Sequence, residues 1–263
     1  MLDSPGLCII DARYDLGDVE AGRSAWLEGH IPGAVHLDLH RDLSGTPGEH
    51  GGRHPLPDLE QMTDVFGAAG VGPDSRVVVY DAETGMFAAR VWWMLRYLGF
   101  GAVQVLDGGF SAWKRGNHPV STEPAPARST VFVPDVRHEM LASRDEVMAA
   151  LGNDAVLIID ARSGERYRGE VAAFDPVAGH IPGAVNFPYG ANLQDGRLRP
   201  PAELAQLYLQ VAAAPETIAY CGSGVSAALD VLAIAEAGLP MPRLYAGSWS
   251  DWSSYGDAPV EKG

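Results

Sequence analysis

The sequence predicts an α/β protein built from two similar domains, each a parallel sheet with helices on both faces. The first observation is an internal repeat: the segment IIDAR at residues 9–13 returns at 158–162, and GHIPGAV at 29–35 returns at 179–185. The second is that each copy alternates short β-branched runs with helical patterns, which is typical of a parallel sheet covered by helices. A period of about 150 residues indicates two domains rather than a solenoid.

Local patterns predict the individual elements. Runs rich in β-branched residues predict strands, and they lie at residues 8–10, 77–80, 156–159 and 217–220. Apolar residues at helical spacing predict a helix over 87–98, in which we expect Trp92, Trp93 and Tyr97 in the core rather than on a surface for stacking bases. Ser143 predicts the N-cap of a helix that opens the second copy.

The stretch between the copies predicts a linker. Residues 121–136 are rich in proline, alanine and serine, a composition that suits neither a helix nor a central strand. We therefore expect an N-terminal domain over residues 1–120, this linker, and a C-terminal domain over residues 137–263.

Composition and charge limit the possible partners and the compartment. The chain has 263 residues, of which 46% are hydrophobic and 20% charged, as in a globular protein. Cys8 and Cys221 can form at most one disulfide and no charged-then-apolar leader opens the chain, so we expect a reduced, cytoplasmic protein. The net charge of −15 repels nucleic acid and anionic lipid. No apolar run is long enough to span a bilayer, so we expect neither nucleic acid nor a membrane as a partner.

Cys221 is the residue at which the chemistry of the two copies differs, because it aligns with Asp81 of the first copy. It follows a buried strand and precedes a glycine-bearing loop and a helix, where ligands collect in open α/β folds. Loop N–H groups and the positive helix end would stabilise a thiolate and lower its pKa. The alternative is a buried core cysteine, and this is what we expect of Cys8, which lies within an apolar run.

These motifs resemble the two-domain rhodanese-type sulfurtransferases. The resemblance rests on the tandem DAR and GHIPGA segments, the loop at 221–226 and the closing GSWSDW at 247–252, and it spans nearly the whole chain. It implies two rhodanese-like domains, of which the first is inactive because Asp81 replaces the nucleophile. It also implies transfer of a sulfane sulfur from thiosulfate or 3-mercaptopyruvate, through a persulfide on Cys221, to cyanide or a thiol acceptor. No organic cofactor and no metal is expected.

The same resemblance indicates which residues bind the donor. Arg166 matches an arginine that holds the anionic donor at the cysteine, and His54 matches a loop that borders the cleft between the domains. The donor-binding loop comprises Gly222, Ser223, Gly224, Val225 and Ser226. It resembles the loop of mercaptopyruvate-using members, but their second arginine is replaced here by Asp175. Because a carboxylate there would repel a carboxylate donor and forfeit a charge-assisted pair, we expect thiosulfate to be slightly favoured over 3-mercaptopyruvate.

Three other functions fit parts of the sequence. Cysteine-dependent phosphatases resemble this loop but carry arginine where this chain has Ala227, so a phosphate-binding fork is missing. A sulfur carrier or docking protein would accept its sulfur from a protein partner on the same cysteine. His36, Asp38 and His40 would share one face of a strand and suit a zinc-dependent hydrolase, but the second copy lacks these ligands.

Overall fold

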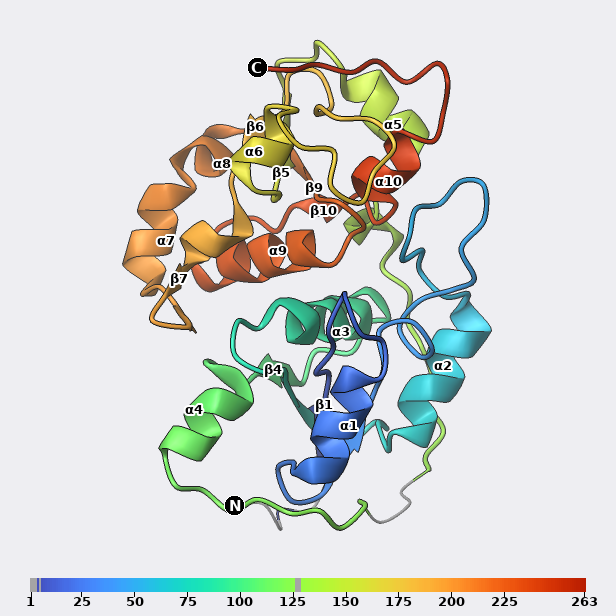
Figure 1. The fold of residues 1–263 in the computed structure, drawn as a ribbon, viewed down its shortest axis with the longest axis vertical. Coiled ribbons are helices and arrows are strands. Elements are labelled where there is room, and N and C mark those ends of the chain that lie inside the picture. The colour runs from blue at the N-terminus through green and yellow to red at the C-terminus, as the bar shows by residue number, and fades with distance from the viewer. Residues whose placement is uncertain (1–3, 5, 126–128) are drawn as a thin grey trace. The chain divides into compact units, whose positions relative to one another are not determined.

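The computed structural model describes residues 4, 6–125 and 129–263. The chain forms two compact units (Figure 1), which comprise Met1–Gly45 with Leu56–Arg137, and Thr46–Pro55 with His138–Gly263. The segment Thr46–Pro55 therefore belongs to the unit built by the second repeat, although in sequence it lies within the first. The expected linker over 121–136 includes residues 126–128, which lie outside the described residues.

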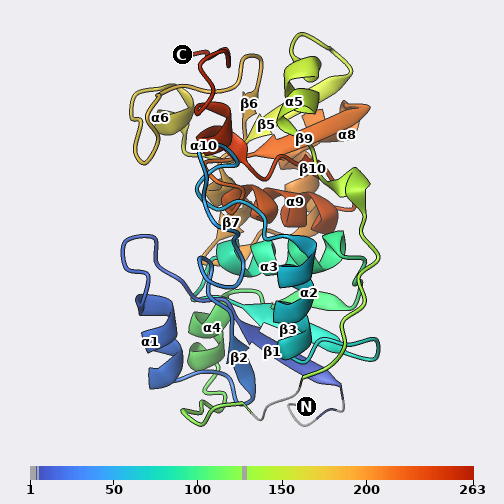
Figure 2. The same cartoon turned by 90° about the vertical axis from the view of Figure 1, so that its right-hand side faces the viewer.

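The first unit is built on a parallel sheet with strand order β2-β1-β3-β4. Its strands are β1 (Leu7–Asp11), β2 (Ala34–His36), β3 (Arg76–Tyr80) and β4 (Val103–Val105). The sheet is flanked by helices (Figure 2), namely α1 (Ala21–Glu28), α2 (Leu59–Ala68), α3 (Met86–Tyr97) and α4 (Gly109–Arg115). The strands and the helix that the sequence predicts here are confirmed, and α3 buries Trp92, Trp93 and Tyr97.

The second unit repeats this order as β6-β5-β9-β10, again with parallel strands. Its strands are β5 (Val156–Asp160), β6 (Val185–Asn186), β9 (Glu216–Tyr220) and β10 (Arg243–Leu244), with a short hairpin of β7 (Leu193–Gln194) and β8 (Arg197–Leu198). Its α-helices are α5 (Arg144–Ala150), α6 (Gly164–Tyr167), α7 (Pro201–Leu207), α8 (Leu209–Ala213), α9 (Ser226–Glu236) and α10 (Ser248–Trp252). Single 3-10 turns occupy His138–Met140 and Tyr189–Asn192. None of the described helices is long and apolar enough to cross a bilayer.

Helix α5 begins as the sequence predicts. The Ser143 side chain accepts the backbone N–H of Glu146, and the Glu146 carboxylate accepts the backbone N–H of Ser143 at 2.8 Å. This reciprocal capping box satisfies N–H groups that a helix start otherwise leaves without partners.

The repeated Asp-Ala-Arg motif fixes the end of the first strand in each sheet. Arg13 binds Asp11 with Nη2 2.6 Å from Oδ2, and Arg162 binds Asp160 with the same separation. Each guanidinium also donates to the carbonyl of the glycine that opens the repeated GHIPG turn, at 2.8 Å and 2.7 Å. All four charged side chains are buried. The repeated motif thus makes the same structural contacts in both units, between the end of a strand and the GHIPG turn.

Candidate active site

Cys221 lies directly after β9, where the chain turns into the loop that leads to α9, and it is 1% exposed. The start of α10 holds this loop through its backbone. The N–H of Trp249 donates to the carbonyl of Cys221, and the N–H of Ser250 donates to the carbonyl of Gly222, both at 2.9 Å. Cys221, the candidate nucleophile, is thus held in place by β9, which precedes it, and by the start of α10, which binds its loop.

Two unusual backbone conformations shape the loop. Gly224 has a φ of +75°, and a Cβ there would lie 2.3 Å from the carbonyl oxygen of Ala246, so only glycine fits. Ser248 has a φ of 56°, a conformation that costs a non-glycine residue roughly 1–2 kcal/mol. Its hydroxyl accepts the N–H of Cys221 at 3.0 Å and donates to the carbonyl of Tyr245 at 2.9 Å. Strain is therefore held at the residue that positions the cysteine backbone.

The surroundings of Cys221 favour the thiolate. Burial by itself raises the pKa of the thiol, but hydrogen bonds and a positive charge outweigh it, so the pKa lies below its ordinary value. The groups that lower the pKa are the Ser226 hydroxyl, the backbone N–H groups of Ala227 and Ser223, and the Arg166 guanidinium. The N–H of Gly224 also donates to the sulfur at 3.1 Å. Cys221 is thus a buried thiol placed to act as an anion.

The first unit has a carboxyl group at the same place in its fold. The carboxylate of Asp81, in the loop between β3 and α3, accepts the N–H groups of Glu83 at 3.1 Å, Gly85 at 2.9 Å and Phe87 at 3.0 Å. Burial raises the pKa of Asp81 above its ordinary value, and these N–H groups offset only part of that effect. Within one chain, this loop type therefore surrounds a carboxylate in the first unit and a thiol in the second.

Two guanidinium groups lie beside the Cys221 loop. A Cβ built on Gly222 would lie 2.7 Å from Nη2 of Arg166 and 3.0 Å from Nη2 of Arg53. Asp175, whose carboxylate is fully buried, joins the two arginines: its Oδ2 accepts from Arg166 at 2.8 Å and its Oδ1 accepts from Arg53. The sequence suggests that Asp175 would face the donor with an uncompensated charge. The structure differs, because both oxygens of that carboxylate are already paired with arginine.

His54 and Arg53 reach the loop because the segment Thr46–Pro55 belongs to the second unit. His54 is 4% exposed, and its Nδ1 lies 2.8 Å from the Ser223 hydroxyl. The backbone N–H of Arg53 donates to the Ser250 hydroxyl at 3.0 Å. Figures 1 and 2 both show this blue segment beside α10. A loop from the first repeat thus contacts the loop that follows Cys221 in the second.

The structure places the residues named from the sequence together. Gly222, Ser223, Gly224 and Val225 form the loop after Cys221, and Ser226 is the first residue of α9; Arg166 and His54 adjoin this loop. Sequence reasoning missed Arg53. The one signal that could have found it is its position directly before His54, in a segment already matched to the active-site region.

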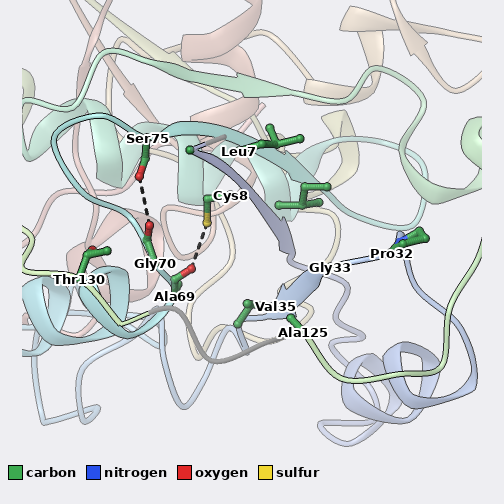
Figure 3. A pocket seen from close by; sticks show the side chains of 12 residues that line it. Leu7, Cys8, Pro32, Gly33, Val35, Ala69, Gly70, Ser75, Ala125 and Thr130 are labelled. Carbon is green, nitrogen blue, oxygen red and sulfur yellow. Dashed lines mark hydrogen bonds between the residues drawn. The ribbon is translucent and has the colours of Figure 1, made fainter. Parts of the chain in front are cut away.

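Cys8 lies at the amino-terminal end of β1, away from the edge of the sheet at which Asp81 lies. Its thiol donates to the carbonyl of Ala69 at 3.1 Å, and it lines a cavity of about 220 Å³ in the first unit together with Val35 and Thr130 (Figure 3). The expectation that Cys8 is buried is confirmed.

The histidines of the first repeat have structural contacts. Nε2 of His36 lies 3.1 Å from the carbonyl oxygen of Arg13, and the ring of His40 packs edge-on against Tyr14. Asp38 accepts the N–H of His40 at 2.9 Å. Within residues 4, 6–125 and 129–263, no group of three or more acidic, histidine or cysteine side chains could hold a metal ion.

Comparison with known proteins places this fold and site. The rhodanese-like domain family matches residues 1–116 and 143–255. The chain is 43% identical to a probable 3-mercaptopyruvate sulfurtransferase of Pseudomonas aeruginosa, with 100% of this chain and 94% of that protein covered. It is 37% identical to a thiosulfate sulfurtransferase of Azotobacter vinelandii, with 99% and 93% covered. The crystal structure of SseA from Escherichia coli, a 3-mercaptopyruvate sulfotransferase, has a TM-score of 0.84 at 34% identity, with 95% of each chain covered.

The chain belongs to the rhodanese family, and within it to the two-domain sulfurtransferases. It is an enzyme that transfers sulfur.

Proposed function

We propose that this sulfurtransferase carries the transferred sulfur as a persulfide on Cys221 and takes it from a small anionic donor. The observation that supports this most is the Cys221 thiol itself: it has a lowered pKa, it accepts loop N–H groups, and two guanidinium groups lie beside its loop. A thiolate in this setting is a nucleophile that meets an anion without net repulsion.

In the first step the Cys221 thiolate attacks the outer sulfur of the donor. With thiosulfate, the sulfur–sulfur bond breaks and sulfite leaves with the electron pair. With 3-mercaptopyruvate, the carbon–sulfur bond breaks and the electron pair leaves on carbon as the enolate of pyruvate, which takes the proton of the donor thiol. Both routes leave a persulfide anion on the enzyme, and the N–H groups of the loop stabilise it.

In the second step the acceptor attacks the terminal sulfur of the persulfide. A thiolate becomes a persulfide and cyanide becomes thiocyanate, while the electron pair of the broken sulfur–sulfur bond returns to Cys221. Asp81 supports the idea that loops of this type direct N–H groups at the side chain in this position, because its oxygens accept loop N–H groups in the first unit.

Thiosulfate and 3-mercaptopyruvate are both candidate donors, as the names of the relatives suggest. The expected slight preference for thiosulfate depends on an unpaired Asp175, and pairing with Arg53 and Arg166 removes that reason. A reducing compartment such as the cytoplasm suits a free catalytic thiol. The net charge of −15 disfavours nucleic acid as a partner.

Mass spectrometry of the intact protein after donor treatment tests the proposal. One added sulfur, about 32 Da, should map to the peptide that contains Cys221. Cys221→Ser should lose both the adduct and turnover while keeping its unfolding midpoint, because oxygen there cannot form a persulfide. Cys8→Ser is the matched control and should keep both. An adduct on any other residue, or an active Cys221→Ser, contradicts the assignment.

A further inference from the structure

A buried carboxyl group that the proposed reaction does not use lies in α9, the helix that follows the Cys221 loop. Asp230 comes four residues after Ser226, so both side chains lie on the same face of α9. Helical side chains point back toward the N-terminus of the helix, and the charge of Cys221 acts on the pKa of Asp230. Asp230 is 0% exposed. A titratable group thus lies within electrostatic reach of the thiol and out of contact with solvent.

The contacts of Asp230 suit a protonated carboxylic acid. The Tyr208 hydroxyl donates to Oδ1 of Asn192 at 2.8 Å, and Nδ2 of Asn192 donates to Oδ1 of Asp230 at 2.7 Å. Oδ2 of Asp230 is buried and receives no hydrogen bond from the residues that the structure describes. A proton on Oδ2 can be donated to the oxygen of Tyr208, which interacts with Asp230, so that the three side chains form a closed ring in which each donates once and accepts once. A carboxylate there would be a buried charge with one oxygen unsatisfied, which is unfavourable.

The electrostatic environment favours the same protonation state. Burial raises the pKa of Asp230 well above its ordinary value, and hydrogen bonds offset only part of this effect. Among the described residues, the titratable groups that act on it most strongly are Cys221 after β9, Tyr208 between α7 and α8, and Asp160 at the end of β5, which is paired with Arg162. The charges of Cys221 and Asp160 raise the pKa of Asp230 further. An ionised Asp230 would in turn oppose the thiolate, because two like charges would lie close together in a buried site.

We propose that Asp230 is a positioning residue for Cys221, which as a neutral acid anchors the start of α9 through this ring of hydrogen bonds. The ring joins α9 to the 3-10 turn at Tyr189–Asn192 and to the junction of α7 and α8. The first residues of α9 supply the Ser226 hydroxyl and the Ala227 N–H that lower the pKa of Cys221, so their position at the sulfur depends on where the helix is held. The proposal rests on the proposed function, because it assigns a role at the nucleophile of that function. It requires hydrogen bonds at position 230 and no charge.

The test replaces Asp230 with asparagine and with leucine. Asparagine keeps the hydrogen bonds without a charge, and leucine keeps neither. The rate of alkylation of Cys221 by iodoacetamide, measured against pH and mapped to its peptide by mass spectrometry, reports the thiolate without any sulfur transfer. The matched control is Asp145→Asn, which removes the charge of an aspartate whose side chain is 94% exposed.

Asp230→Leu should move the alkylation profile to higher pH by roughly 0.5–1 pH unit, as expected when hydrogen bonds to the thiolate weaken. Asp230→Asn should restore the wild-type profile, and Asp145→Asn should not change it. Tyr208→Phe removes one hydroxyl from the ring and should move the profile in the same direction as Asp230→Leu, but by less. This variant keeps the test decisive if Asp230→Leu does not fold.

Infrared spectra test the protonation state of Asp230 directly. The wild-type protein at neutral pH should show the carbonyl stretch of a protonated carboxylic acid, and Asp230→Asn should lack it. Burial also raises the pKa of Asp81, so its band is assigned with Asp81→Asn. In Cys221→Ser the Asp230 band should disappear at lower pH than in the wild type, because the thiolate that opposes ionisation of Asp230 is gone and the coupling is reciprocal.

A profile at lower pH in Asp230→Asn overturns the proposal, since it would show that Asp230 carries a negative charge, and the absence of the Asp230 band has the same meaning. Equal changes in Asp230→Asn and Asp230→Leu overturn it because hydrogen bonding would then not be the cause. A wild-type profile in Asp230→Leu excludes a positioning role. If Cys221 forms no adduct with a donor, the proposed function fails, and the alkylation profiles still decide the role of Asp230.

Discussion

At the residue scale, the proposed chemistry depends on how the buried Cys221 thiol is kept in a reactive form. Burial opposes ionisation of Cys221, and the Ser226 hydroxyl is the first of the groups that reverse this effect. Free cysteines are most often buried core residues, and Cys8 is buried in the first unit. Reactivity therefore comes from the donors around the sulfur rather than from exposure, since Cys221 is 1% exposed.

Replacing Ser226 with alanine should shift the pH profile of persulfide formation. Because the pKa of Cys221 is lowered, the thiolate persists as the pH falls below the ordinary thiol pKa of about 8.5 and is lost only as the pH passes the lowered value. Ser226→Ala removes a donor, raises that pKa, and should move the acid limb of the rate to higher pH. Single-turnover rates across pH measure this, with Ser75→Ala in the first unit as control. Identical profiles for Ser226→Ala and wild type would contradict the assigned role.

At the scale of elements, the loop after Cys221 is held by contacts between the residues that precede α9 and the segment that leads into the first residue of α10. Gly224 packs against the carbonyl of Ala246, and Ser248 holds the N–H of Cys221. In the first unit the position before Phe110 is Gly109, whose φ is also 56°. The second unit accepts a strained serine at the matching turn, and this serine gives the cysteine backbone a partner.

Two glycines at opposite ends of α9 should respond differently to alanine. Gly238, which follows the helix, has a φ of +74° and nothing within 4 Å of an added Cβ. Gly238→Ala should therefore cost only the backbone strain, roughly 1–2 kcal/mol, and keep activity. Gly224→Ala adds a clash with the backbone to the same strain, so it should lose more stability and most of its activity. Denaturant unfolding and steady-state rates decide this, and similar behaviour of both variants would count against a tight loop.

At the scale of the whole molecule, two units share one fold and differ in chemistry. The same strand order, the same buried Asp-Arg pair and the same turn occur in both. Only the second unit has a thiol after the strand that precedes its long helix, because the first has Asp81 there. Folding requirements therefore explain the repeated motifs, and the proposed active site lies where the repeats diverge.

The repeated ion pairs predict matched losses of stability in both units. Arg13→Met and Arg162→Met each leave a buried aspartate without its counter-ion, which should cost roughly 3–5 kcal/mol. The exposed pair Arg199–Glu203 gives the control, since Arg199→Met should cost less than about 1 kcal/mol. Urea unfolding of the three variants provides the measurement. Small losses in all three would mean that the motif does not fix the strand ends.

The sequence by itself determined the repeat, the fold class and the nucleophile candidate. Strands, the helix over 87–98 and the Ser143 cap follow from local patterns, because side-chain periodicity and capping act within a few residues. Cys221 could be found because it follows a predicted strand and aligns with Asp81, so its place at the sheet edge is set by the same short-range pattern.

Only the tertiary structure decided which charged side chains lie beside the Cys221 loop. Arg53 and Asp175 are 122 residues apart in sequence, and Arg53 belongs to the second unit although it lies in the first repeat. No periodicity links such residues, since their contact depends on where a loop is held by Ser250 and Ser223. From the sequence alone, Asp175 is a residue that replaces the second arginine of the mercaptopyruvate-using members. In the folded chain Asp175 is a buried carboxylate paired with two arginines beside the Cys221 loop, because a buried charge requires partners and the fold supplies them.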